Sequence, residues 1–165
     1  MHSTRHLFIT AIMALALSPA MAAGPQSRAQ AFLDSAMKGD NAEIMLGKLA
    51  VERGKAAAVR SYGKMLAEDH ETHRQRLEAL GVALGVAKTD DPTPEGRAAH
   101  GRLSAMAGDA FDKAFAMHMV SDHRKDIARY ETEARTADNP QVKALAQDTL
   151  PTLRRHLEAA EALAK

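Results

Sequence analysis

Apolar residues recur at every third or fourth position along four long stretches of the chain, which is the spacing of one face of an α-helix. The stretches cover residues 27–53, 56–81, 105–137 and 141–164. We find no convincing run of alternating apolar and polar residues of the kind that indicates a β-strand. The pattern therefore predicts an all-α fold, a four-helix bundle in which the apolar faces share one core.

The breaks between these stretches indicate how the helices connect. Gly54 and Lys55 separate the first two helices, and Pro140 ends the third because proline cannot continue a helix. Residues 82–104 are longer and rich in Gly, Pro and Asp, so we expect an irregular connection there. At about 3.3 Å per residue this connection could run the length of a helix. A ferritin-like order with one crossover and a simple up-down-up-down order both fit it.

Several histidines and carboxylates interrupt the apolar faces. The second helix has a seam spaced by four and three residues, and it contains His70 and His73 where apolar residues would be expected. A weak internal repeat accompanies this seam. An aromatic residue, an apolar residue and an Asp-His pair recur at the same spacing around Asp69-His70 and around Asp122-His123. The two Asp-His pairs thus occupy equivalent helical settings.

Counting residues from the first turn places one set of these groups at a common height. Glu43 lies about twelve residues before Lys55, while Asp69 and His70 lie about fourteen and fifteen residues after it. Because the two helices would be antiparallel, the three side chains should reach the same level of the bundle.

The second turn gives the same result for the other two helices. Asp122 and His123 lie about sixteen or seventeen residues before Asn139, and His156 lies about seventeen residues after it. Both sets fall near the middle of the helices. The sequence therefore predicts one buried polar layer, with these candidate metal ligands: Glu43, Asp69, His70, Asp122, His123 and His156.

Two interpretations of this layer remain open. Carboxylates and imidazoles that project inward from four helices are how helical bundles bind divalent metal ions, and Zn, Fe, Mn and Cu are all candidates. Alternatively, the groups hydrogen-bond one another and fix the register of the helices without binding a metal.

Three residues near the layer have simpler expected roles. We expect His73 and His118, each one turn from the layer, to be partly exposed, although both could serve as extra ligands. Asp112 lies near the start of the third helix, where the helix dipole favours an acidic residue.

The first 22 residues resemble a cleavable secretory signal. Arg5 precedes the apolar run LFITAIMALAL, and Ser18-Pro19 and the small residues AMAA follow it. The apolar run is too short for a lasting membrane anchor. We therefore expect residues 23–165 to form a single domain that is exported to the periplasm.

Composition excludes several classes of function. The chain has no cysteine, which excludes disulfides and a lipid-modified N-terminus. Of 22 basic residues, loss of Arg5 leaves 21 against 21 acidic ones, so no basic surface for nucleic acid or anionic lipid is expected. Catalytic-triad and nucleotide-binding signatures are also missing. The residues favour a non-enzymatic role and assign no reaction.

Four stretches carry a family resemblance: NAEIMLGKLA, MLAEDHETH, GDAFDKAFAMHMVSDHRKDIARYETEA and LPTLRRHLEAAEAL. They are similar to a bacterial exported family known as domain of unknown function 4142, and the resemblance covers about residues 28–163. It implies a ferritin-like fold and the following recurrent polar positions: Glu43, Asp69, His70, Asp112, Asp122, His123 and His156. The family implies no settled activity.

A di-iron ferritin would carry Glu-x-x-His on two helices, a pattern that this chain departs from. Ala67 lies three residues before His70, and Leu153 lies three residues before His156. Ferroxidase chemistry is therefore disfavoured. Two functions remain. One is a periplasmic metal-binding bundle, either a metal buffer or a small oxidoreductase with a mononuclear or dinuclear centre. The other is an envelope stress protein whose polar layer is structural and whose surface contacts a second copy or another envelope protein.

Overall fold

The computed structural model describes residues 24–165, and the regular elements in this part of the chain are all helices, without a strand. The predicted signal segment, residues 1–22, lies outside the described residues. The helices are α1 (Pro25–Arg53), α2 (Ala57–Ala83), α3 (Pro94–Ser104), α4 (Gly108–Thr136) and α5 (Pro140–Leu163). The all-α prediction is confirmed. None of the helices in the described part combines the length and apolar character that a membrane crossing requires.

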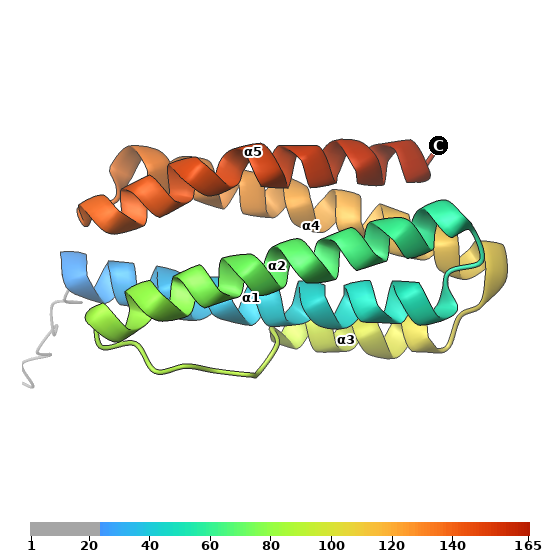
Figure 1. Ribbon diagram of the computed structural model, residues 1–165, viewed down its shortest axis with the longest axis horizontal. Helices are drawn as coiled ribbons and strands as arrows, with labels where there is room; N and C mark the ends of the chain where they lie inside the picture. Colours follow the sequence, from blue (N-terminus) through green and yellow to red (C-terminus); the bar gives the residue numbers. More distant parts are fainter. Residues whose placement is uncertain (1–23) are drawn as a thin grey trace, which may run out of the picture.

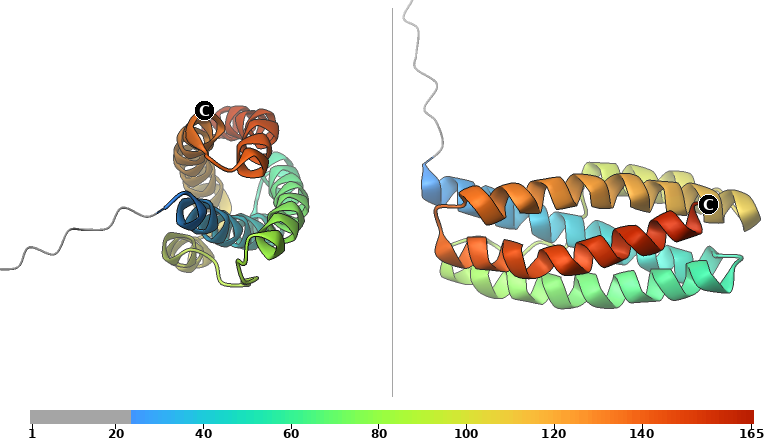
Figure 2. Two further views of the ribbon diagram at one scale, coloured as in Figure 1. Left: turned by 90° about the vertical axis from the view of Figure 1, so that its left-hand side faces the viewer. Right: turned by 90° about the horizontal axis from the view of Figure 1, so that it is seen from above.

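Four long helices lie side by side, and the short helix α3 packs on the outside of α1 (Figures 1 and 2). α1 and α2 form one antiparallel hairpin, and α4 and α5 form the other. The connection between the hairpins travels back along the molecule, so that α2 and α4 run in the same direction (Figure 1). The connection between α2 and α4 is therefore a crossover along the bundle.

Helix α3 corrects the prediction of an irregular connection over residues 82–104. Only the ten or so residues between α2 and α3 are irregular. The Thr93 side chain accepts a hydrogen bond from the backbone N–H of Gly96 at 3.0 Å, which caps the helix. Pro94 lies in the first turn, where a backbone N–H would have no partner within the helix, so its lack of an N–H loses no hydrogen bond. The positive end of the helix dipole stabilises the acidic side chain of Glu95.

Asp112 joins the two hairpins near one end of the bundle. Its carboxylate accepts hydrogen bonds from the backbone N–H groups of Lys55 and Ala56, at 2.9 and 2.8 Å. Ala56 precedes the first residue of α2 and has no side chain that could cap the helix. Asp112 therefore fixes the α1–α2 turn against α4, a role beyond the dipole effect that the sequence predicted.

A pair of glycines allows α1 and α2 to approach closely. A Cβ atom added at Gly47 would lie 2.6 Å from the carbonyl oxygen of Gly63, and one added at Gly63 would lie 2.6 Å from that of Gly47. Both distances are well below van der Waals contact. The crossing point of the two helices thus requires glycine on both sides.

The apolar core is divided into two clusters. One cluster contains Phe32, Leu77 and Tyr130, and the other contains Leu66 and Phe115, each with further apolar residues around them. Along each of the four long helices, buried polar residues separate the two clusters. These residues are Asp40, Glu43, His70, His73, His123 and His156. A buried polar layer is therefore present at mid-height, and it contains four of the six predicted residues, whereas Asp69 and Asp122 are half-buried.

Candidate metal centre

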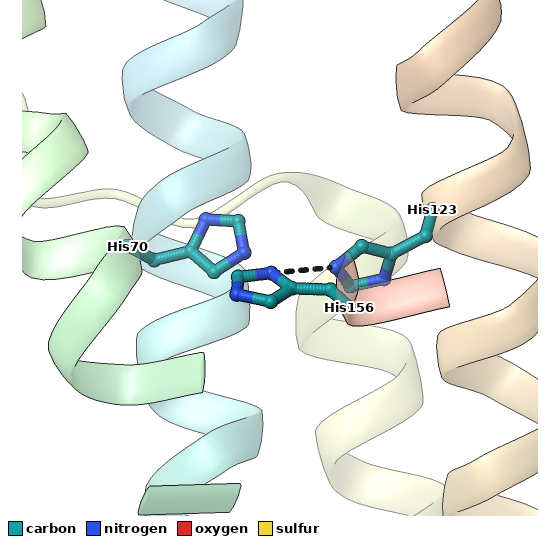
Figure 3. Close-up of side chains that lie close together, drawn as sticks. All are labelled: His70, His123 and His156. Atoms are coloured by element: carbon teal, nitrogen blue, oxygen red, sulfur yellow. Dashed lines mark hydrogen bonds between the residues drawn. The ribbon is translucent and has the colours of Figure 1, made fainter. Parts of the chain in front are cut away.

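Three imidazoles meet in the middle of the polar layer. His70 on α2, His123 on α4 and His156 on α5 are buried, and their rings turn toward one another (Figure 3). One ring nitrogen from each residue lies within 4.8 Å of the other two. Nε2 of His123 and Nδ1 of His156 are 3.3 Å apart. We refer to His70, His123 and His156 as the three-histidine group.

The outward hydrogen bonds of His123 and His156 determine which nitrogen carries the hydrogen in each ring. Nδ1 of His123 donates to the carbonyl oxygen of Met119 at 3.0 Å, since a carbonyl oxygen can only accept. Nε2 of His156 donates to the carboxylate of Asp69 at 2.8 Å. In the neutral rings, the nitrogens that face each other at 3.3 Å therefore both carry lone pairs.

Asp69 is well placed to remain an ionised acceptor. The same oxygen, Oδ2, also accepts from the guanidinium of Arg155 at 2.8 Å. Burial raises the pKa of Asp69, but the hydrogen bonds from His156 and Arg155 outweigh this effect and leave the pKa below its usual value. A carboxylate behind a ligating imidazole is the common way in which proteins orient a metal-binding histidine.

Asp40 orients the ring of His70 in the way that Asp69 orients the ring of His156. Its two carboxylate oxygens lie 2.8 Å from Nδ1 of His70 and 2.8 Å from Nδ1 of His73. Burial raises the pKa of Asp40, but the interactions with His73 and His70 outweigh it and lower the pKa overall. Nε2 of His70 is buried and has no hydrogen-bond partner in residues 24–165. It is therefore free to act as a ligand.

The surroundings keep two of the three rings neutral. Burial, followed by the repulsion of His70 and His156, lowers the pKa of His123 to about 3. Burial also lowers the pKa of His156 to about 4, although the hydrogen bond to Asp69 opposes this shift. A proton shared between the two facing nitrogens is thus disfavoured near neutral pH.

The separation of two of the three imidazole nitrogens fits coordination of one metal ion. Two nitrogen ligands at about 2.05 Å from one ion, separated by the tetrahedral angle, lie about 3.3 Å apart. Nε2 of His123 and Nδ1 of His156 already have this separation. Three imidazoles are ligands that zinc, copper and iron accept, whereas manganese prefers oxygen ligands.

A family model described as a domain of unknown function (DUF4142) matches residues 14–163. The chain belongs to this family. Searches of curated proteins and of solved structures found no match. Membership in the DUF4142 family extends over nearly the whole chain, and it names no reaction or ligand.

The structure separates the six predicted ligands into two sets. His70, His123 and His156 form the group described above, and Asp69 supports His156 from behind. Glu43 is 1% exposed, and neither of its carboxylate oxygens has a hydrogen-bond partner in the part of the chain that the structure describes.

Glu43 and Asp122 make up the second set. Burial raises the pKa of Glu43 well above its usual value, and the neighbouring carboxylate of Asp122 raises it further. Burial and Asp122 also raise the pKa of Asp126 to about 6. A protonated carboxyl group is a poor metal ligand, so Glu43 could serve as a ligand only after loss of its proton.

Two residues of the layer differ from the prediction or were missed. His73 was expected to be partly exposed, but it is buried, because Asp40 provides a carboxylate for its ring. Asp40 itself was not predicted. It lies one helical turn before Glu43, and this i, i+3 spacing on a buried face was the signal that could have identified it. His118 is half-buried, in line with its prediction.

Proposed function

We propose that the chain is an exported, ferritin-like bundle that binds one divalent transition metal ion through His70, His123 and His156. The observation that carries this proposal is the pair of facing lone pairs on His123 and His156 at 3.3 Å. Two acceptors at this distance repel each other, and a cation between them removes the repulsion. The lowered pKa values keep both rings neutral near neutral pH, so protons do not compete for the two lone pairs.

The positions of the carboxylates support a mononuclear site. Asp40 and Asp69 each hold the hydrogen-bearing nitrogen of a ligand ring, so they lie behind the imidazoles. In di-iron bundles, carboxylates bridge the two metals. Binding and storage of a single ion therefore agree better with the arrangement than ferroxidase chemistry, and Zn, Cu and Fe fit the donors better than Mn.

Export to the periplasm is part of the same proposal. It is supported by the charged, apolar and small-residue segments in residues 1–22. The mass of protein recovered from the periplasm of an expressing bacterium tests it, because cleavage would leave a chain that begins at residue 23 or 24. Full-length protein in the cytoplasm would contradict it.

Metal analysis of untagged protein tests the proposed centre. We expect about one equivalent of metal per chain after dialysis against Zn²⁺ or Cu²⁺, and loss of that metal in His123→Ala. His100→Ala is the matched control, because His100 lies on α3, outside the polar layer. Metal-free wild-type protein after this treatment would contradict the proposal.

A structural role for the layer is the second candidate function. The hydrogen bonds from His70 and His73 to Asp40 favour it, because they satisfy buried polar groups without any metal. In that case the chain acts as a non-catalytic envelope protein. The metal analysis separates the two candidates, since a structural layer retains no metal.

A further inference from the structure

Two histidines of α2 share the carboxylate of Asp40. Oδ1 of Asp40 lies 2.8 Å from Nδ1 of His70, and Oδ2 lies 2.8 Å from Nδ1 of His73. Because an ionised carboxylate can only accept hydrogen bonds, Nδ1 donates in both rings. His70 and His73 are three residues apart on α2, so they lie on the same face of the helix, within reach of one carboxylate from α1.

His73 itself is not one of the candidate metal ligands. In the described part of the chain, the ring nitrogens that meet within 4.8 Å belong to the three-histidine group, which does not include His73. The ring of His73 lies beside that of Tyr130 on α4, with 5.7 Å between the two ring centroids, and both side chains are buried. Packing therefore holds His73 in place, and its hydrogen bond to Asp40 connects it to the centre.

This second hydrogen bond fixes the orientation of the Asp40 carboxylate. The terminal torsion of an aspartate side chain is soft, so a single hydrogen bond would leave the carboxylate able to rotate. With one oxygen bonded to His70 and the other to His73, a rotation would break both hydrogen bonds. Asp40 is only 4% exposed, so water is poorly placed to replace a lost donor. His73 therefore keeps Oδ1 of Asp40 on the ring of His70.

The hydrogen bond from His70 to Asp40 determines which nitrogen of His70 can bind a metal ion. A neutral imidazole carries one hydrogen, and with that hydrogen on Nδ1 the lone pair is on Nε2. Nε2 of His70 is buried and lacks a hydrogen-bond partner within residues 24–165. In the other tautomer, Nε2 would carry the hydrogen and could not coordinate a metal.

Asp69, the carboxylate behind His156, also has a second donor, but a less rigid one. Asp69 accepts hydrogen bonds from His156 and from Arg155, each at 2.8 Å. The side chain of Arg155 is 57% exposed, whereas that of His73 is 10% exposed. An exposed ion pair contributes little, because solvent competes for both partners. Of the two additional donors, His73 should therefore have the larger influence on the centre.

We propose that His73 is a positioning residue of the metal centre: its hydrogen bond to Asp40 holds His70 in the tautomer that binds metal through Nε2. The inference rests on the proposed function, because metal affinity is the property that His73 raises. His73 supplies a hydrogen bond and no lone pair to the metal. The centre thus depends on four histidines, although only three of them are ligands.

Two substitutions separate the hydrogen bond of His73 from its volume. His73→Leu fills the space but lacks the donor, whereas His73→Asn retains an N–H on the atom that corresponds to Nδ1. We expect the Kd for Zn²⁺, measured by competition with a chelating dye, to rise about 10- to 100-fold in His73→Leu. In His73→Asn it should remain close to that of the wild type. His100→Leu, at a histidine on α3 outside the polar layer, is the matched control and should not change the Kd.

Nitrogen-15 NMR of the metal-free protein measures the tautomer of His70 directly. The chemical shifts of the two ring nitrogens show which one carries the hydrogen, and His70→Ala identifies the signals by their absence. We expect the hydrogen on Nδ1 in the wild type and in His73→Asn, and a mixture of both tautomers in His73→Leu. A purely structural role of His73 would lower the melting temperature without changing this tautomer.

The outcomes separate this inference from the proposed function. An unchanged Kd and an unchanged His70 tautomer in folded His73→Leu would overturn the inference and leave metal binding intact. A wild-type spectrum with the hydrogen on Nε2 of His70 would overturn it without any variant. If circular dichroism shows that His73→Leu does not fold, His73→Met, which also lacks the donor, decides the result. A wild type that binds no Zn²⁺ would overturn the proposed function, and this inference with it.

Discussion

Nε2 of His123 and Nδ1 of His156 face each other at 3.3 Å, and in both neutral rings this nitrogen is a hydrogen-bond acceptor. The hydrogen of each ring is committed elsewhere, to the carbonyl of Met119 and to the carboxylate of Asp69. The pair therefore lacks the proton that would make it a hydrogen bond. The metal binding that we propose for this chain follows from these two facing acceptors.

Metal ions should stabilise the fold. A ligand that binds only the folded state adds RT ln(1 + [L]/Kd) to the free energy of unfolding, about 4 kcal/mol at a thousandfold excess over Kd. We expect Zn²⁺ or Cu²⁺ to raise the melting temperature and a chelator to lower it. His123→Ala should melt at the same temperature under both conditions. A wild-type melting curve that neither metal nor chelator moves would assign the layer to structure alone.

Asp40→Asn should weaken metal binding without removing a ligand. Asp40 holds His70 in the tautomer that leaves Nε2 free, and such outer partners contribute about 10- to 100-fold to metal affinity. We therefore expect the Kd for Zn²⁺, measured by competition with a chelating dye, to rise by about this factor. Asp109→Asn, on the exposed first turn of α4, should leave the Kd unchanged.

Glu43→Gln should change how stability depends on pH. The pKa of Glu43 is raised in the folded state, so the folded chain retains a proton that the unfolded chain loses above about pH 4.5. The wild type should therefore lose up to about 1.4 kcal/mol of stability per pH unit, relative to Glu43→Gln, as the pH rises above about 5 toward the raised pKa of Glu43.

Urea unfolding with chelator present measures this difference. Glu52→Gln, which removes an exposed carboxylate, serves as the control and should follow the wild type at each pH. Parallel pH profiles of Glu43→Gln and wild type would show that Glu43 is ionised in the folded chain.

Gly63→Ala should destabilise the protein although alanine favours helices. The added Cβ would lie 2.6 Å from the carbonyl oxygen of Gly47, so α1 and α2 would have to separate. We expect a loss of about 1–3 kcal/mol, as for other overpacked sites. At Gly101, in α3, an added Cβ meets nothing within 4 Å. Gly101→Ala should instead gain up to about 1 kcal/mol from helix propensity. A stable Gly63→Ala variant would contradict the close crossing.

The three-histidine group could be found from the sequence because helices are regular. Each residue advances the helix by about 1.5 Å, so equal distances from a turn place side chains of antiparallel helices at equal heights. This count brought His70, His123 and His156 to one level, and their nitrogens do meet. All three residues lie near the middle of their helices, so they share one level whichever way the second hairpin runs.

Helix α3 was missed because its composition resembles that of a loop. Asp90, Asp91 and Pro92 end one segment, and the Thr93-Pro94-Glu95 sequence then begins another. A capping residue followed by proline at the first helical position marks the start of a helix. Here this signal predicts the helix better than the glycine content of the segment, which suggested a loop.

The hydrogen bonds of Asp40 could not be predicted from the periodicity of the sequence. A sequence pattern places a residue on a face of a helix, but it does not specify which side chain on a neighbouring helix that residue contacts. His73 appeared too polar to be buried, and the carboxylate that allows its burial lies 33 residues earlier in the chain. Pairing of this kind depends on the tertiary structure.

The division of the core by the polar layer gives each half of the molecule its own optical reporter. The chain has two tyrosines and no tryptophan, and Tyr62 lies in one apolar cluster while Tyr130 lies in the other. Replacing either tyrosine by phenylalanine leaves a single fluorophore. Emission during unfolding then reports on one half at a time, so the cooperativity of the two halves becomes directly observable.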